Sequence, residues 1–359
     1  MHSGVLVFHM DVALSLLDRS RTREGQDDAS ALRQTLHRAE LAEAAGYRRF
    51  WVAEHHAVPG VASGAPALLI QAIADRTRHI RVGSAGVMLP NHQPIVVAEQ
   101  FAMLEALHPG RIDLGVGRSL GFTAPIREAL RTTRAEPDDF AADIDELRAY
   151  LDDTAPVSIR PQVAQPPPLF VLGTGAGLQV AARLGLPAVV AGPILTQGPA
   201  PFERYRADYR PSAANPEPYL VIGADILIAD SEADAVDLLL PEGWAMALSR
   251  ERGYFPPLMQ LESLRDLPVT VRRQRILDDT AASAIVGTED QVAERIEKLV
   301  EETGAAEVLS SASTFDVDAL YASDARLARL FGVGGPSAAP AARIASASEA
   351  TITSANRVR

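Results

Sequence analysis

The sequence contains no cysteine, which excludes disulfide bonds, thiolate metal sites, iron–sulfur clusters held by cysteine and a cysteine nucleophile. No apolar run reaches the ~18 residues of a membrane-spanning helix, and the N-terminus lacks the basic-then-apolar pattern of a signal peptide. Positive charge is also in deficit. The chain has 34 Lys and Arg against 46 Asp and Glu, a net charge of −12, which disfavours a nucleic-acid or polybasic membrane surface. We expect a cytoplasmic protein with no nucleic-acid or membrane partner.

Hydrophobic residues make up 47% of the 359 residues, enough for a large buried core. Short β-branched runs alternate with stretches of helical period. The predicted strands are Val5–His9, Phe50–Ala53, Ile80–Leu89, Ile112–Val116, Leu169–Leu172, Ala188–Ala191, Leu220–Ala229 and Glu307–Ser310. The predicted helices are Ala31–Ala45, Ala65–Arg78, Ile95–Leu107, Asp138–Leu151, Gly177–Leu184, Glu232–Leu239 and Glu289–Glu302. About eight strand–helix units predict an α/β fold of the (β/α)₈ TIM-barrel type, with an open doubly wound sheet as the alternative.

Two stretches exceed a plain strand–helix repeat, and one segment looks non-globular. We expect loop insertions at 117–137, after the fourth strand, and at 242–282, after the seventh. Their aromatic and apolar residues suit a large apolar substrate or simply pack the loops onto the barrel; these are Phe122, Trp244, Tyr254, Phe255 and Met259. The last residues are small and polar, so we expect a barrel over 1–332 and a flexible tail over 333–359.

Glu54, His55 and His56 follow the second predicted strand. The carboxyl ends of barrel strands line the active site, so Glu54 and His55 are candidate catalytic residues. A histidine exchanges protons near neutral pH, and a nearby carboxylate tunes that exchange. A purely structural pair of hydrogen-bonded histidines at a strand end explains the pattern equally well.

Small residues lie within the third predicted strand, and one arginine follows the fourth. Ala85 and Gly86 lie within the third strand, where they leave room for a flat group or allow close packing of a neighbouring element. Arg118 follows the fourth strand and suits a phosphate or carboxylate, although a surface ion pair is the commoner role for such a residue.

A glycine-rich turn precedes the helix that begins near residue 177. The turn contains Gly173, Thr174, Gly175 and Gly177. Unpaired backbone N–H groups at a helix N-terminus bind phosphate. The spacing is not that of a dinucleotide fold, and no acidic residue occurs between Gly173 and Phe202 to hold a ribose. A mononucleotide phosphate therefore remains the better candidate.

A metal-dependent barrel hydrolase is a further alternative, built from His9, Asp11, His55 and His56. The sequence has neither a His-x-His pair nor a His-Glu-x-x-His motif, so we expect no metal ion.

The segment Phe50–Arg118 contains EHH, GSAGVMLPNH and LHPGRIDLGVGR, and it resembles the bacterial-luciferase-like flavin-dependent monooxygenases. The turn near Gly173 and the helix Glu289–Glu302 extend the resemblance to about Phe331. Within that family the chain is most similar to a single-component actinobacterial branch that includes polyketide-tailoring enzymes.

The resemblance implies a (β/α)₈ barrel that binds reduced FMN and uses O₂ as co-substrate. It implies that the flavin ring lies against Ala85–Gly86, often joined by a non-prolyl cis peptide in the family. It places His55 and Glu54 at the flavin, with the phosphate bound by Arg118 and by Gly173, Thr174, Gly175 and Gly177. Luciferases carry a reactive cysteine where this sequence has Gly117, which disfavours light-emitting chemistry.

The implied function is an FMNH₂-dependent monooxygenase. It would insert one oxygen atom of O₂, by epoxidation or hydroxylation, into an apolar, polyketide-type secondary metabolite through a C4a-hydroperoxyflavin. A separate NAD(P)H:flavin reductase would supply FMNH₂, and the protein would form a homodimer. The alternatives are an F420-dependent oxidoreductase and a non-catalytic flavin-binding relative, with the metal-dependent hydrolase least favoured.

Overall fold

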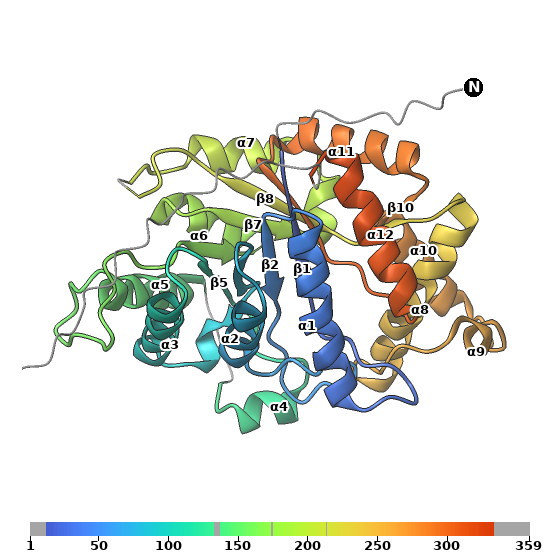
Figure 1. Ribbon diagram of the computed structural model, residues 1–359, viewed down its shortest axis with the longest axis horizontal. Coiled ribbons are helices and arrows are strands. Elements are labelled where there is room, and N and C mark those ends of the chain that lie inside the picture. Colours follow the sequence, from blue (N-terminus) through green and yellow to red (C-terminus); the bar gives the residue numbers. More distant parts are fainter. Residues whose placement is uncertain (1–11, 133–136, 174, 213, 334–359) are drawn as a thin grey trace, which may run out of the picture.

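The computed structural model describes residues 12–132, 137–173, 175–212 and 214–333, and parallel strands form a closed barrel within them (Figure 1). The strands are β1 (Ala13–Asp18), β2 (Arg49–Val52), β3 (Arg81–Ser84), β4 (Val87–Met88), β5 (Ile112–Gly117), β6 (Leu169–Leu172), β7 (Ala188–Ala191), β8 (Leu220–Ala224) and β11 (Glu307–Ser310). Their order is β3-β2-β1-β11-β8-β7-β6-β5-β4, and β3 also pairs with β5. Since β3 and β4 both pair with β5 and share one position, the barrel has eight strand positions, which confirms the (β/α)₈ prediction.

Three predicted strands differ from the observed ones. The first barrel strand is β1 (Ala13–Asp18), whereas the predicted Val5–His9 lies outside the described residues. The third is interrupted at Ala85–Gly86, so one predicted strand becomes β3 and β4. The seventh ends at Ala224, and the rest of that run forms β9 (Ile226–Ile228) in another sheet.

The outer helices follow the apolar periodicity closely. Those near their predicted positions are α1 (Asp28–Ala44), α2 (Pro66–Arg76), α3 (Pro94–Leu107), α5 (Pro137–Leu151), α6 (Ala176–Leu184) and α11 (Glu289–Thr303). Helix α11 begins with the expected capping box of Thr288 and Gln291, buries Val292 and Ile296, and ends at the left-handed Gly304. The prediction missed α7 (Ala200–Ala207) and α12 (Val317–Leu330). No helix within the described ranges has the length and apolarity needed to cross a membrane.

The two segments expected as loops contain helices. The first carries the short α4 (Ala124–Ala129), which lies below the barrel in Figure 1. The second belongs to a unit made of β9, α8 (Glu232–Arg252), α9 (Leu261–Arg265), α10 (Val271–Ser283) and β10 (Ile285–Gly287). Strands β9 and β10 pair in parallel as a separate two-stranded sheet. Trp244, Leu248 and Leu264 form a small apolar core in this unit, with Met259 packed against it.

A buried ionic network closes the amino-terminal end of the barrel. Arg49, at the start of β2, lies 2.7 Å from Asp113 of β5 and 3.1 Å from Glu307 of β11. Ser15 of β1 donates a hydrogen bond to Glu307, and Tyr219 donates another at 2.7 Å. Because these charges are paired within the barrel, they block one end and leave the carboxyl ends of the strands for a ligand.

Candidate active site

A cavity of about 530 Å³ opens at the carboxyl ends of the barrel strands, which is a usual size for a small-molecule site. Residues at the ends of different strands line it, including Leu17, Gly117, Leu172, Val189, Gly223 and Leu309. Most of the predicted site residues also line it, namely Glu54, His55, Ala85, Gly86, Arg118, Gly173 and Gly177. Gly175 caps α6 without lining the cavity, and Thr174 lies outside the described residues.

One wall of the cavity is the cis peptide between Ala85 and Gly86, which the family resemblance predicted. At Gly86 the chain passes so close to β5 that an added Cβ would lie 2.9 Å from the carbonyl oxygen of Gly115. A side chain is thus disfavoured at this position, and the wall presents backbone to the cavity.

Glu54 is the most constrained charged group at the cavity. Its buried carboxylate accepts hydrogen bonds from Nε2 of His56 at 2.5 Å, Nε2 of His92 at 2.7 Å and the N–H of Met88 at 2.9 Å. Burial raises the pKa of Glu54, but the hydrogen bonds from His56 and His92 outweigh it and lower the pKa to about 2. Glu54 is therefore an anion at neutral pH that accepts hydrogen bonds and has no proton to donate.

His55 is held as a neutral imidazole. Burial lowers its pKa, and the positive charges of Arg19 and Arg21 lower it further, to about 4. Its Nδ1 atom is buried and finds no hydrogen-bond partner among the described residues. Its backbone N–H donates to the carbonyl of Ser63 at 2.8 Å, which fixes the chain. This neutral ring can accept a proton or hydrogen-bond a ligand, but it carries no spare proton at neutral pH.

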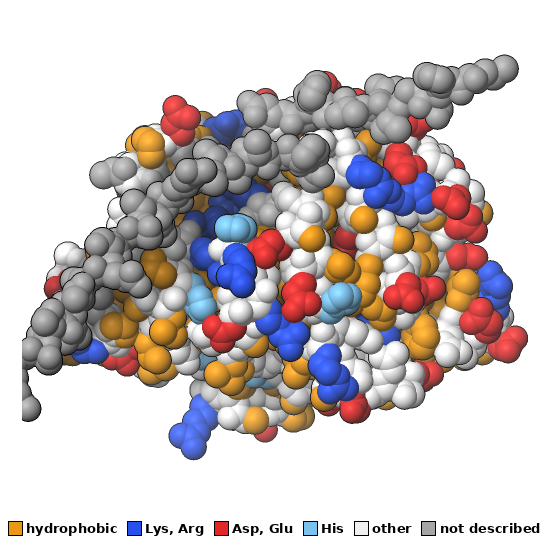
Figure 2. All heavy atoms as spheres, viewed as in Figure 1, with side chains coloured by type: hydrophobic (Ala, Val, Ile, Leu, Met, Phe, Trp, Pro, Cys, Tyr) orange, Lys and Arg blue, Asp and Glu red, His pale blue; other side chains and the backbone are white. Residues whose placement is uncertain are grey.

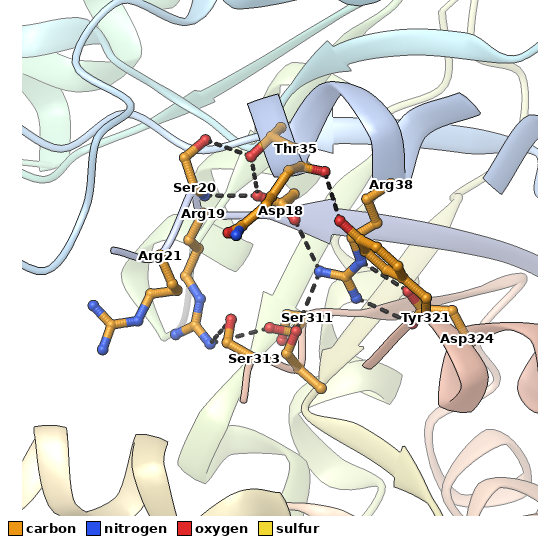
Figure 3. A network of polar contacts seen from close by, with 12 residues as sticks. Asp18, Arg19, Ser20, Arg21, Thr35, Arg38, Ser311, Ser313, Tyr321 and Asp324 are labelled. Atoms are coloured by element: carbon orange, nitrogen blue, oxygen red, sulfur yellow. Dashed lines mark hydrogen bonds and ion pairs between the residues drawn. The ribbon is translucent and has the colours of Figure 1, made fainter. Parts of the chain in front are cut away.

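Two arginines that were not predicted from the sequence, Arg19 and Arg21, follow β1, and Figure 3 shows both side chains on the segment after Asp18. Arg19 lies 3.1 Å from Glu242 and donates to the carbonyl of Ser311 at 3.0 Å. Arg21 lies 3.0 Å from the same Glu242, and its guanidinium carbon lies 4.5 Å from the ring centre of Phe255. Since Glu242 belongs to α8, these ion pairs fasten the helical unit to the barrel and place two cations near His55.

The cation expected to bind phosphate has no partner among the residues that the structure describes. Arg118 lines the cavity, and within the described part of the chain no side chain or carbonyl pairs with it. At the end of the neighbouring strand β6, Gly173 already donates its N–H to the carbonyl of Val189 at 3.1 Å. Free N–H groups must come from the first turn of α6 instead, where Ala176 and Gly177 begin the helix. This arrangement suits an anion held by one fixed charge and a helix N-terminus.

The residues expected to choose an apolar substrate do not line this cavity. Trp244 and Met259 pack within the helical unit, and Phe122 and Phe255 form an edge-to-face pair with ring centres 6.2 Å apart. Tyr254 is 40% exposed. The role of Trp244 and Met259 is therefore to pack the inserted segment.

Comparisons with known proteins agree with this arrangement. A profile of the luciferase-like monooxygenase family matches residues 10–307. The protein YvbT of Bacillus subtilis is 36% identical over 318 residues, which is 85% of this chain and 93% of that protein. A luciferase-like monooxygenase of Escherichia coli K12 is 36% identical over 316 residues, covering 85% of this chain and 92% of its own.

Solved structures show the same fold. Apo-MsnO8 superimposes with a TM-score of 0.82 at 33% identity, covering 90% of this chain and 99% of its own. More distant structures share the fold alone. They include the oxygenating constituent of 3,6-diketocamphane monooxygenase of Pseudomonas putida in complex with FMN (TM-score 0.66, 17% identity, 89% of this chain, 97% of that chain). An F420-dependent secondary alcohol dehydrogenase is similar to a comparable degree (TM-score 0.63, 16% identity, 91% and 100%).

Proposed function

Since the chain belongs to the luciferase-like monooxygenase family and is an oxygen-incorporating flavin-dependent enzyme, we propose that it uses FMNH₂ to add one atom of O₂ to an apolar secondary metabolite. The observation that carries the choice of FMN is Arg118, a cation at the edge of the cavity that has no partner in the described part of the chain. The first turn of α6, which follows the neighbouring strand β6, offers N–H groups that have no partner within the helix. Together they suit a terminal phosphate, which FMN has and riboflavin lacks.

The rest of the cavity fits a flavin. Arg118 and α6 would hold the phosphate, and the wall at Ala85–Gly86 would face the ring system, because it presents backbone without bulky side chains. When bound, reduced FMN supplies the electrons with which O₂ is activated.

The chain's own residues would prepare and protect this chemistry. The apolar side chains of Leu17, Met88 and Leu172 line the cavity and exclude water from it. His55, which is neutral at pH 7 because its pKa is about 4, would accept a hydrogen bond or a proton at Nδ1, which has no partner among the described residues. Glu54, fixed by three hydrogen bonds, would keep a negative charge beside the site.

The same apolar lining favours an apolar substrate, which the enzyme would epoxidise or hydroxylate. We propose that a separate NAD(P)H:flavin reductase delivers FMNH₂. The diketocamphane enzyme, whose structure is that of an "oxygenating constituent", supports such a division of labour.

We also propose a homodimer formed through α2 and α3. Leu68, Met103 and Leu107 are 75%, 53% and 61% exposed and line one groove of about 420 Å³. Figure 2 shows hydrophobic side chains gathered over these two helices. Contiguous exposed apolar surface of this kind is typical of a protein–protein interface.

Anaerobic titration of the purified protein with reduced FMN and with reduced F420 tests the cofactor. We expect saturable binding of one reduced FMN per cavity and weaker binding of F420. Equal or tighter binding of F420, or no binding of FMN, would overturn the proposal in favour of an F420-dependent oxidoreductase.

A further inference from the structure

Glu54, His56 and His92 bring three metal-ligating side chains to one point beside the flavin cavity. Oε1 of Glu54 lies 2.5 Å from Nε2 of His56 and 2.7 Å from Nε2 of His92, and the three ligand atoms all lie within 4.8 Å of one another. The carboxylate is inaccessible, whereas the two imidazoles are 21% and 28% exposed. His56 follows β2 and His92 follows the turn after β4, so neighbouring barrel positions fix the cluster.

We propose that these three side chains form a binding site for a divalent transition-metal ion, with Zn²⁺ as the best match. Two imidazoles and one carboxylate form the three-ligand set of an open zinc site, in which water takes the fourth position. Mg²⁺ and Ca²⁺ prefer all-oxygen sets, and soft ions prefer sulfur, which this sequence provides only as methionine.

The ligand atoms need only a small rearrangement to accept the ion. Donor atoms around a tetrahedral Zn²⁺, each about 2.0–2.1 Å from the metal, lie about 3.3 Å apart. The two contacts of Glu54 with His56 and His92 would therefore lengthen by less than about 1 Å, within reach of partly exposed rings. Oε2 of Glu54 accepts the N–H of Met88 at 2.9 Å, an outer contact of the kind that orients a ligating carboxylate.

The electrostatics also favour a cation at this point. The Glu54 carboxylate is buried, and Nε2 of His56 and Nε2 of His92 both donate their protons to it, so the three ligand atoms already face one another. An ion between the three groups replaces those two protons, which move to Nδ1 of each ring, while the carboxylate keeps a positive partner.

The ion has two routes to the site. Glu54 and His92 line the groove between α2 and α3, and Glu54 also lines the flavin cavity. A second copy covering the groove would therefore still leave the cavity side open. Metal binding requires no flavin, so it can be measured on flavin-free protein whether or not the enzyme uses FMN.

Calorimetric titration of the chelator-treated, full-length protein with Zn²⁺ tests the site. We expect one ion per chain to bind at micromolar concentration. His92→Gln and His56→Gln each keep an N–H for Glu54 but remove an imidazole. They should weaken binding more than about tenfold, the least that losing even an outer partner of a metal ligand costs. The matched control is His37→Gln, which removes an exposed histidine 3.4 Å from Glu40 on α1, and it should bind Zn²⁺ like the wild type.

Failure to saturate at micromolar Zn²⁺, or equal binding by wild type and His92→Gln, would overturn the assignment. Circular dichroism checks that each variant folds. If one does not, nuclear magnetic resonance of ¹⁵N-histidine in the wild type decides. We expect Zn²⁺ to remove the Nε2 protons of His56 and His92, and unchanged Nε2 signals would exclude both as ligands.

Discussion

Arg118→Ala should weaken the binding of reduced FMN much more than that of reduced riboflavin. Arg118 has no partner within the described residues, so a bound phosphate would be its main interaction. A hydrogen bond to a charged group contributes about 1.5–3 kcal/mol, which converts to about 10- to 150-fold in the dissociation constant. Because Arg118 is only half-buried, solvent screening favours the lower part of that range.

Anaerobic calorimetry with the two reduced flavins separates the possible roles of Arg118. Arg118→Lys keeps the charge but loses the planar fork, so its affinity for FMN should lie between those of wild type and the alanine variant. Arg127→Ala is the matched control, because Arg127 lies on nearby α4, bonds to the carbonyl of Gly121 and does not line the cavity. Equal weakening of FMN and riboflavin by Arg118→Ala would show that the arginine only shapes the cavity.

Three further outcomes follow from the described contacts. His55→Ala should fold and form product about 10²–10⁴-fold more slowly than the wild type. The turnover of the wild type should not fall between pH 7.5 and pH 6.5, because burial and two arginines lower the pKa of His55 to about 4. If His55→Ala forms product as fast as the wild type, His55 has only a structural role. Arg38→Met should cost about 3–5 kcal/mol in urea unfolding, since it strands two buried aspartates, whereas Arg33→Met on the same helix should change little. Similar losses in the two variants would refute a stabilising role for the ion pairs of Arg38 with Asp18 and Asp324. Leu107→Glu should turn the dimer into a monomer in light scattering, while Val271→Glu, 91% exposed outside the groove, should not.

The sequence was sufficient to predict the barrel because β-branched strands and amphipathic helices alternate regularly. It was insufficient for β1, whose ALSLLD sequence mixes helix-forming and polar residues. Ser15 and Asp18 of that strand are buried. Ser15 donates a hydrogen bond to Glu307 of β11, and Asp18 pairs with Arg38 of α1. Such long-range partners override local propensity and leave no periodic signal.

In the candidate site, too, residues with a local sequence signal were predicted, and residues that depend on distant partners were not. Residues at the ends of correctly predicted strands, such as His55 and Arg118, do line the cavity. Arg19 was missed because its strand was placed too early in the chain. His92 was missed because its role depends on Glu54, which lies next to it only after β2 and the segment following β3 are joined in the barrel.

If this cavity binds reduced FMN, as proposed, it also controls the reaction of the flavin with O₂. Stopped-flow absorbance tests it directly, by mixing the protein and FMNH₂ with oxygenated buffer and following the appearance of oxidised FMN. We expect the protein to slow that appearance and to produce an additional absorbing species first, and Arg118→Ala to reduce the amount of that species. Reoxidation identical to that of free FMNH₂, with no additional species at saturating protein, would show that the cavity does not control the reaction of FMNH₂ with O₂.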